Sequence, residues 1–253
     1  MARVSIGCSG FSYGHWRGNF YPEGMAQKDW FHHYRSVFST VELNVTFYRT
    51  PTIETFKHWY EESEEDFSFA VKGSRYITHV KRLSDLGNAL ERFFTPAQEL
   101  KEKLGVVLWQ FPPQFKCNLQ RLQEFLDNLG KYLFRTTLEF RNDSWLTDDV
   151  VKICKDKNVS LCMADWPPYL DETPVTADFV YIRRHGQQGS YNGYYSTAEL
   201  EKDAARIKKY LERGLDVFIY FNNDAGGAAP QNAVELASIL QNVHHISPHL
   251  PSR

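Results

Sequence analysis

The chain has 253 residues, of which 42% are hydrophobic and 24% charged, and its 29 Lys and Arg against 31 Asp and Glu give a formal net charge of -2. These values are ordinary for a soluble globular protein, so they exclude a disordered or fibrous chain, and the balanced charge argues against a polycation built to coat nucleic acid. No apolar run approaches the ~18 residues of a membrane span, so we expect no membrane partner.

The cysteines and the N-terminus predict the redox compartment. Residues 1–10 contain no apolar stretch of the length that a signal peptide needs. The four cysteines fit neither a C-x-x-C metal motif nor a disulfide framework, and they are Cys8, Cys117, Cys154 and Cys162. We therefore expect a reduced, cytoplasmic protein.

Eight short apolar runs, rich in β-branched residues, predict eight strands. In chain order these are Val4–Cys8, Ser39–Val45, Phe67–Lys72, Val106–Phe111, Thr136–Arg141, Val159–Asp165, Phe179–His185 and Val217–Asn222. The segments between them carry apolar residues near helical spacing, which predicts helices at Gln27–Val37, Ile53–Glu62, Leu83–Lys103 (broken at Pro96), Leu119–Lys131, Thr147–Lys157, Thr197–Arg213 and Pro230–Val243. Ser196 is an expected N-cap and Gly214 an expected C′ glycine.

Strands that alternate with helices imply parallel pairing through right-handed crossovers, and the simplest architecture with eight such units is an α/β fold of the closed (β/α)8 TIM type. The segment from Asp165 to Phe179 is too short and too rich in proline for a normal helix, so we expect the sixth helix to be reduced to a turn. No linker divides the chain, which predicts a single TIM-barrel domain over residues 1–253.

The alternation within each strand predicts which side chains face the barrel interior. The polar residues of the interior set gather at the carboxyl ends of the strands, here called the mouth, where TIM barrels build active sites. They are Glu42, Asn44, Lys72, Gln110, Glu139, Arg141, Arg183, His185, Asn222 and Asp224, with Asp165 at the end of the sixth strand in an orientation that the pattern leaves open. Buried charges are costly unless they are paired or used, so this set predicts a functional mouth.

Many short motifs along the chain also resemble those of one family. They include Gly7–Tyr13 (GCSGFSY), His15–Gly18 (HWRG), Thr40–Asn44 (TVELN), Ser74–His79 (SRYITH), Gln110–Pro113 (QFPP), Glu139–Arg141 (EFR) and Tyr220–Asp224 (YFNND). This order of motifs resembles the "domain of unknown function 72" family, also called YecE-like. The resemblance implies a TIM-type barrel and no assigned activity. The sequence departs from the family at Asn142, where histidine is common, which argues against a scheme that needs a base there.

Two readings of the mouth compete with each other. Glu139, Asp165, His185 and Asp224 are similar to the metal ligands of xylose-isomerase-like barrels, and such oxygen and nitrogen donors suit Mg²⁺, Mn²⁺ or Zn²⁺. Arg141 and Arg183 lie on the same faces and would repel a divalent cation, so an ion-pair network is the simpler alternative.

The basic residues near the mouth favour an anionic ligand. Lys72 and Arg75 lie on the third strand and its loop, and Arg17 lies in the first loop beside Tyr13 and Trp16. The glycine-containing loops Gly186–Ser196 and Ala225–Pro230 are candidates for a phosphate site.

We therefore expect an enzyme that acts on an anionic or phosphorylated small molecule or nucleotide at the mouth, without a cofactor. In this hypothesis Glu42, Glu139 and His185 are catalytic. The expected substrate-binding residues are Tyr13, Trp16, Arg17, Asn44, Lys72, Arg75, Gln110, Arg141, Asp165, Arg183, Asn222 and Asp224. The alternatives are a nucleic-acid-binding protein and a metal-dependent isomerase or endonuclease, while the sequence predicts no oligomeric state.

Overall fold

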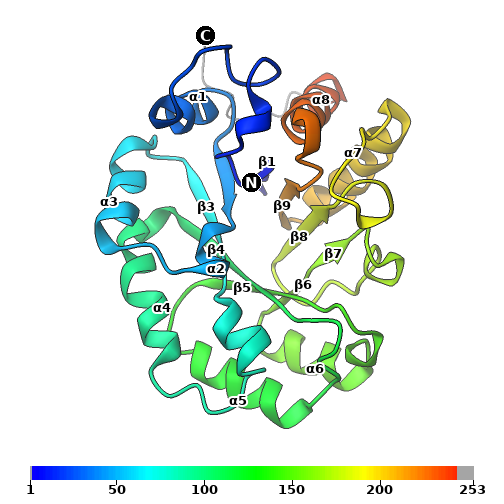
Figure 1. Ribbon diagram of the computed structural model, residues 1–253. Coiled ribbons are helices and arrows are strands. Elements are labelled where there is room, and N and C mark those ends of the chain that lie inside the picture. Colours follow the sequence, from blue (N-terminus) through cyan, green and yellow to red (C-terminus); the bar gives the residue numbers. More distant parts are fainter. Residues whose placement is uncertain (1, 244–253) are drawn as a thin grey trace.

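The computed structural model describes residues 2–243 and has nine parallel strands surrounded by helices (Figure 1). The strands are β1 Val4–Ser9, β2 Thr40–Leu43, β3 Ser68–Lys72, β4 Leu104–Gln110, β5 Arg135–Glu139, β6 Ser160–Leu161, β7 Met163–Ala164, β8 Phe179–Arg184 and β9 Asp216–Phe221. The helices are α1 Trp30–Arg35, α2 Val45–Tyr48, α3 Ile53–Glu62, α4 Ala89–Ala97, α5 Leu119–Leu129, α6 Asp148–Asp156, α7 Thr197–Glu212 and α8 Ala228–Val243. Within the described residues, no helix is long and apolar enough to cross a membrane.

The sheet closes into a barrel because its two end strands follow each other directly in the chain. Its order is β6-β5-β4-β3-β2-β1-β9-β8-β7, so β1 pairs with β9 and the two ends of the sheet are β6 and β7. Only Cys162 separates these two strands, and its N–H donates to the Leu138 carbonyl at 2.9 Å. They are two halves of the predicted sixth strand, and the predicted TIM-type barrel is confirmed.

The sixth strand has an unusual edge. β6 pairs with β5, but on its other side two threonine hydroxyls of the following loop satisfy its backbone. The Leu161 N–H donates to Thr176 Oγ1 at 3.2 Å, and Thr176 Oγ1 donates to the Val159 carbonyl at 2.6 Å. Thr173 Oγ1 donates to the Leu161 carbonyl at 3.2 Å. The pairing with β8 resumes only at β7.

The predicted sixth helix is reduced to the 3-10 turn Pro168–Leu170, as expected. The capping predictions are also confirmed, because Ser196 and Glu199 form a capping box at α7 and Gly214 follows that helix with a φ of +79°.

Two predicted boundaries are wrong. Val45 begins the short helix α2 instead of ending a strand. The helix predicted from Leu83 begins at Ala89, because Leu83 and Asp85 adopt positive φ angles. The predicted break at Pro96 is close to the observed one, because α4 ends at Ala97 and a 3-10 turn, Gln98–Lys103, follows it.

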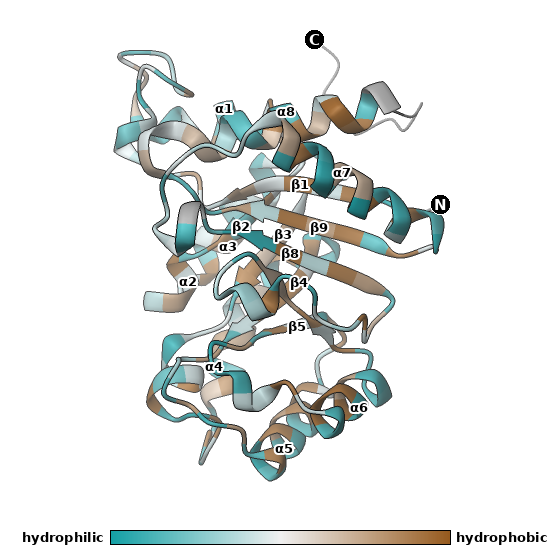
Figure 2. Ribbon diagram, turned by 90° about the vertical axis from the view of Figure 1, so that its right-hand side faces the viewer, coloured by the Kyte–Doolittle hydropathy of each residue, from teal (hydrophilic) through white to brown (hydrophobic). Residues whose placement is uncertain are grey.

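The strand alternation produces two apolar layers. Side chains that point outward pack against the helices, and a smaller cluster fills the barrel itself: Ala70, Val106, Leu108, Cys162, Phe179, Tyr181, Phe218 and Tyr220. Figure 2 shows the strands mostly in hydrophobic colours and the helices with mixed surfaces. The inner apolar cluster forms a floor, and the polar interior residues lie between it and the mouth.

Candidate functional site

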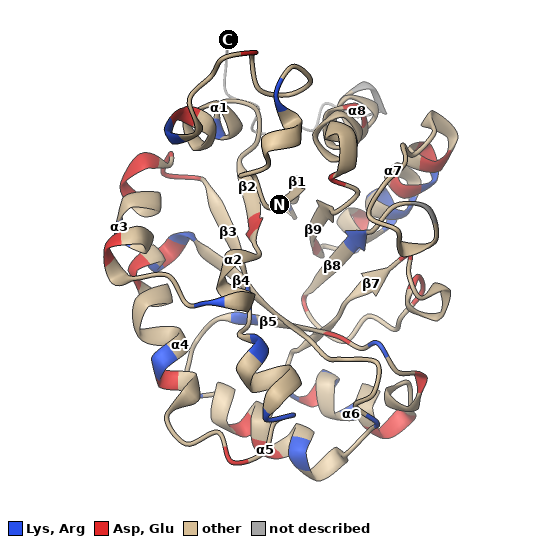
Figure 3. Ribbon diagram, viewed as in Figure 1, with Lys and Arg blue, Asp and Glu red and all other residues tan. Residues whose placement is uncertain are grey.

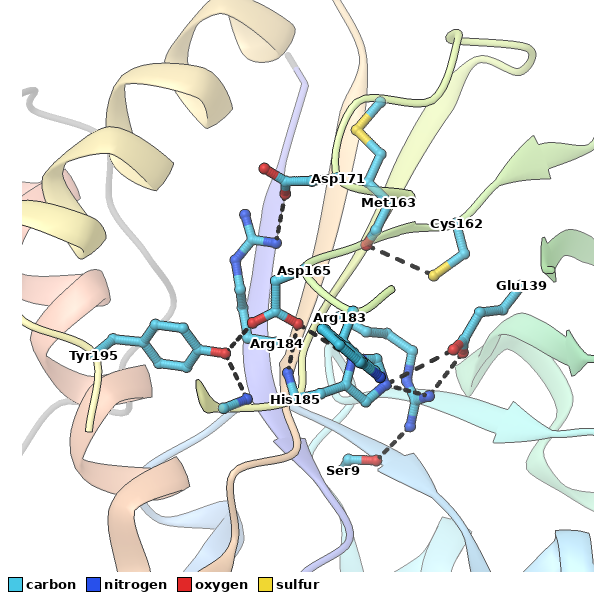
Figure 4. A network of polar contacts seen from close by, with 12 residues as sticks. Ser9, Glu139, Cys162, Met163, Asp165, Asp171, Arg183, Arg184, His185 and Tyr195 are labelled. Atoms are coloured by element: carbon cyan, nitrogen blue, oxygen red, sulfur yellow. Dashed lines mark hydrogen bonds and ion pairs between the residues drawn. The ribbon is translucent and has the colours of Figure 1, made fainter. Parts of the chain in front are cut away.

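A buried arginine joins two buried carboxylates beneath the mouth. Arg183 on β8 is 1% exposed, while Glu42 on β2 and Glu139 on β5 are fully buried. Arg183 Nη2 donates to Glu42 Oε1 at 2.8 Å. Arg183 Nη1 donates to Glu139 Oε2 at 2.7 Å (Figure 4). Figure 3 shows the acidic position on β2 and the basic end of β8 on opposite sides of the barrel opening. The guanidinium therefore bridges strands that are not neighbours in the sheet.

Glu42 accepts further hydrogen bonds from hydroxyl groups. Ser9 Oγ donates to Oε1, and the Tyr181 hydroxyl donates to Oε2 at 2.6 Å. Burial would raise the pKa of Glu42, but the charges of Arg183 and Lys72 and these two hydrogen bonds lower it below its usual value. Glu42 is therefore an ionised acceptor.

Glu139 is held between two arginines. Arg141 forms an ion pair with Glu139 Oε1, and Arg183 binds the other oxygen. Burial opposes ionisation, yet Arg141 and Arg183 bring the pKa of Glu139 far below its usual range.

His185 is a neutral acceptor for both arginines. Its Nε2 lies 2.8 Å from Arg141 Nη2 and 3.1 Å from Arg183 Nη1. Since guanidinium groups only donate, Nε2 must accept, which places the ring proton on Nδ1, 3.3 Å from Asp165 Oδ1. Burial lowers the pKa of His185 to about 4, and the hydrogen bond to Asp165 only partly opposes this.

Asp165 orients the histidine. Its Oδ1 also accepts from the His185 backbone N–H at 2.8 Å, and the Tyr195 hydroxyl donates to its Oδ2. That hydroxyl in turn accepts from the Gly186 N–H at 2.6 Å. Tyr195 was not among the predicted site residues, and its only signal in the sequence is its place in the loop after β8.

Lys72 is the cation of this cluster that lacks a partner. It is partly exposed at the end of β3, and its Nζ lies 4.5 Å from the centre of the Phe47 ring. Within residues 2–243 its ammonium makes no side-chain hydrogen bond or ion pair. Burial, and next the charge of Arg183, lower its pKa to about 8, while Glu139 and Glu42 oppose the shift. Around Glu42 and Glu139 there are thus three cations, Arg141, Arg183 and Lys72, while the third carboxylate, Asp165, is bound to His185 and Tyr195.

Several buried polar atoms beside this cluster have no hydrogen-bond partner among the described residues. They include Asn44 Oδ1, Arg141 Nε and Arg183 Nε. The other end of the Asn44 amide donates to Ser9 Oγ at 2.6 Å. Gln110 is partly exposed at the end of β4, and Asn222 is buried at the end of β9.

The first loop brings a second group to the mouth. The Tyr13 hydroxyl donates to the Ser9 carbonyl at 2.7 Å, and the buried Trp16 donates through Nε1 to the Asp224 carbonyl at 2.9 Å. Asp224 Oδ2 lies 3.5 Å from His15 Nε2. Burial raises the pKa of Asp224, which His15 partly opposes.

Two predicted binding residues lie away from the buried network. The Arg17 guanidinium lies 5.1 Å from the centre of the Trp30 ring on α1. Arg75 is exposed immediately before the π-helical turn Tyr76–Val80. Arg17 therefore packs on the outer helix α1, and neither arginine takes part in the network.

The glycines of the last loop pack against the first loop. Gly226 and Gly227 have φ angles of +66° and +77° and precede α8. Asn19 Nδ2 donates to the Gly226 carbonyl at 2.8 Å, and a Cβ on Gly227 would lie 3.1 Å from the Asn19 Cβ. This turn thus has a packing role.

The metal set considered from the sequence does not fit a metal ion. Glu139 is held by two arginines, His185 presents its free nitrogen to those arginines, and Asp224 lies with the first loop. In the part of the chain that the structure describes, no three His, Cys, Asp or Glu side chains are arranged to hold a metal.

The rim of the mouth is aromatic. Exposed tyrosine and tryptophan side chains lie on the segments that follow β2, β3, β7 and β8: Tyr48, Tyr76, Trp166, Tyr169, Tyr191 and Tyr194. Their faces are available to a ring or an apolar group of a ligand.

A separate cavity of about 790 Å³ lies at the opposite, amino end of the strands. Its lining includes Arg135 and Asp216, which pair with each other at 2.7 Å, and Asp216 also accepts from the Arg3 backbone N–H. Arg135 and Asp216 therefore have their hydrogen-bond partners within the cavity wall. The candidate functional site is the mouth, where polar groups without partners lie.

Comparisons with known proteins agree with this architecture. Residues 5–253 match the model of a family described as "Protein of unknown function DUF72". The chain is 26% identical over 259 residues to the UPF0759 protein YunF of Bacillus subtilis, covering 88% of this chain and 90% of that one. The crystal structure of a DUF72 family protein from Thermotoga maritima is similar with a TM-score of 0.83 and 29% identity, over 94% of this chain and 99% of that one. D-Psicose 3-epimerase has a TM-score of 0.55 at 11% identity over 94% and 96% of the two chains, which is a likeness of fold alone.

Proposed function

Since the chain belongs to the protein family of unknown function DUF72, as its motifs predicted, its activity has to be argued from the mouth of the barrel, and we propose that it is an enzyme acting on a small organic anion bound there. The observation that carries this proposal is Lys72, a cation at the mouth that forms no ion pair with any of the described residues. The anionic group would be a carboxylate or a phosphate ester, bound by Lys72 and Arg141.

The charge balance supports an anion at this position. Glu42 and Glu139 form their ion pairs with Arg183 and Arg141, and Lys72 forms none within residues 2–243. A half-buried cation among other cations is unfavourable unless an anion joins it. Lysine and arginine are also the side chains that most often bind carboxylate and phosphate oxygens.

The remaining polar groups and the rim favour an organic molecule over an inorganic ion. Asn44 presents a buried oxygen without a partner, which could accept a hydrogen bond from a ligand hydroxyl. The exposed aromatic side chains around the mouth offer surfaces for the ligand's ring or apolar part.

The electrostatics suggest roles that differ from those expected from the sequence. Glu42 and Glu139 are held ionised with their oxygens engaged, which suits charge-holding better than proton donation. Lys72, with a pKa of about 8, is the member of the cluster that exchanges a proton near neutral pH. We therefore assign acid–base work to Lys72, and to His185 and Asp165 the positioning of Arg141.

Thermal unfolding in added anions tests this proposal. Inorganic phosphate or malonate at about ten times its dissociation constant should stabilise the protein by about 1.4 kcal/mol, a rise of about 3–5 °C in Tm, relative to potassium chloride of equal ionic strength. Lys72→Met should abolish the rise. The control Lys152→Met should keep it, because Lys152 is an exposed lysine paired with Asp156.

Two results would overturn the proposal. One is the absence of any rise with either anion, or a rise that persists in both Lys72→Met and Arg141→Met. The other is a rise with a short single-stranded DNA and with neither small anion, lost at high salt, which would favour the nucleic-acid-binding alternative.

A further inference from the structure

We infer that Lys72 is a nucleophile that forms an imine with the carbonyl group of a 2-oxo acid whose carboxylate lies on Arg141. This inference rests on the proposed function and names the class of its substrate. It is carried by the Lys72 amine, which has no hydrogen bond or ion pair among residues 2–243, and by Arg141, which is paired but more exposed than Arg183.

A second lysine of the same chain shows what is unusual about Lys72. Lys103 lies 4.5 Å from the centre of the Tyr60 ring, as Lys72 does from Phe47. Lys103 Nζ donates to the Tyr60 carbonyl at 2.7 Å and to the Ser63 carbonyl and Oγ at 2.8 and 3.0 Å. A neutral Lys103 amine would keep only two N–H groups for these three acceptors, whereas the Lys72 amine can lose a proton without losing a hydrogen bond to the described residues.

Burial favours the neutral form of the Lys72 amine, and the charged groups around it act in both directions. Arg183 on β8 and Arg141 after β5 oppose its charge, while Glu139 and Glu42 support it. His79, which packs edge-on to Phe47, has a pKa lowered to about 4 and adds no charge near pH 7. With a pKa of about 8, Lys72 carries a substantial neutral fraction at pH 7.5–8, which an ordinary lysine lacks.

Arg141 is the arginine that can meet the substrate. Its side chain is 8% exposed, against 1% for Arg183. It is anchored from behind by Glu139, His185 and the Trp166 carbonyl, the last at 3.0 Å. A carboxylate placed on Arg141 would bring the adjacent keto carbon toward the interior, where Lys72 lies.

The reaction balances without a further reagent. The lone pair of the Lys72 amine forms a C–N bond to the carbonyl carbon, and the carbonyl oxygen takes up a proton. The C–O bond of this carbinolamine then breaks, and the oxygen leaves as water with the two protons lost by the nitrogen. The product is the imine between Lys72 and the substrate carbon, and no oxidant or reductant is consumed.

Reductive trapping tests the inference. The full chain is incubated at pH 8 with pyruvate and sodium cyanoborohydride, and adducts are located by intact mass and peptide mapping. We expect Lys72 to be labelled faster than the exposed Lys152 by on the order of tenfold or more, since a larger fraction of Lys72 is unprotonated. Lys103 is expected to stay unlabelled.

The Lys72→Arg variant distinguishes the role of Lys72 as a nucleophile from its role as a cation. This variant keeps the positive charge, so it should retain the thermal shift caused by malonate while losing the pyruvate adduct. Acetaldehyde, which has no carboxylate, should label Lys72 more slowly than pyruvate, and Arg141→Met should remove this preference.

The outcomes distinguish the inference from the proposal on which it rests. If pyruvate labels Lys72 no faster than Lys152 while malonate still stabilises the protein, the imine is wrong and the anion site remains. If acetaldehyde labels Lys72 as fast as pyruvate and no anion stabilises the protein, Lys72 is a nucleophile, but both the anionic substrate and the proposed function are wrong.

Discussion

Replacing Arg183 with methionine should destabilise the protein strongly, and the loss should depend on pH. Arg183 is the group that binds both Glu42 and Glu139, each fully buried. Removing it leaves two carboxylates in the barrel with Arg141 and Lys72 as the remaining cations. Methionine fills much of the space of the side chain, so the cost is mainly electrostatic.

The size of the effect follows from the burial of the pair. Removing one partner of a buried ion pair costs about 3–5 kcal/mol, and here one guanidinium serves two carboxylates at 2.7 and 2.8 Å. The residual cations offset part of the additional loss, so we expect about 3–5 kcal/mol at pH 7. For a chain of this size the corresponding fall in Tm is about 6–20 °C.

The pH dependence provides a second signature. In the wild type both carboxyls have depressed pKa values, so their contribution to stability is present above the unfolded pKa of about 4.3 and is lost as pH falls through the folded values. Without Arg183, burial should raise the pKa of Glu42 most, because Glu139 keeps its ion pair with Arg141. The variant is then penalised most at pH 7–8, and the difference from wild type shrinks as the pH falls and these carboxyls take up protons.

Urea unfolding of wild type and Arg183→Met between pH 4.5 and 8 measures both quantities. The double variant Arg183→Met/Glu42→Gln should recover at least about 1 kcal/mol of the free energy of unfolding at pH 7, because it removes one of the two buried carboxylate charges that Arg183 paired. A cost below about 1 kcal/mol, or a cost that does not change with pH and is not recovered by Glu42→Gln, would refute the electrostatic account of this network.

Two further predictions concern packing at the mouth and at the sixth strand. Gly73 follows Lys72, and a Cβ at this position would collide with the buried Trp109 ring. Gly73→Ala should therefore cost about 1–3 kcal/mol in urea unfolding and weaken the stabilisation by anions, and a variant as stable as wild type would contradict this. Thr176→Val should cost about 1–3 kcal/mol in the same assay, because it unpairs the Val159 carbonyl and the Leu161 N–H. The exposed Thr197→Val should cost less than about 0.5 kcal/mol, and equal costs would show that the buried hydroxyl is not special.

Strand periodicity predicted the barrel and much of the arrangement of its interior. Glu42, Glu139 and Arg183 were placed inside by alternation alone, and the structure finds them buried there. This works because a parallel strand with an apolar outer face leaves one side for its polar residues. The orientation of Asp165 stayed open, and the structure shows the reason: the sixth strand is split at Cys162.

The partners within the site could not be predicted in the same way. The contact between Arg183 and Glu42 joins β8 and β2 across the barrel, and it depends on the register of every strand between them. Whether Lys72 has an ion-pair partner likewise depends on distances between side chains, which the pattern of residues along a strand does not give. Arg17 was predicted from its neighbours in sequence, whereas its loop turns it onto Trp30. The single domain, the cytoplasmic location and the absence of a cofactor stay predictions.

The edge of the sixth strand determines where the barrel should open locally. The strands nearest the two ends of the chain are locked together by five paired residues of β1 and β9, from Val4 with Val217 to Cys8 with Phe221. Between β6 and β8 two side-chain hydroxyls replace that ladder. The lowest-energy opening of the barrel should therefore occur in the middle of the sequence. Amide hydrogens around Leu161 would then exchange with solvent before those of β1 and β9, and the mouth would widen first on the side of His185 and Asp165.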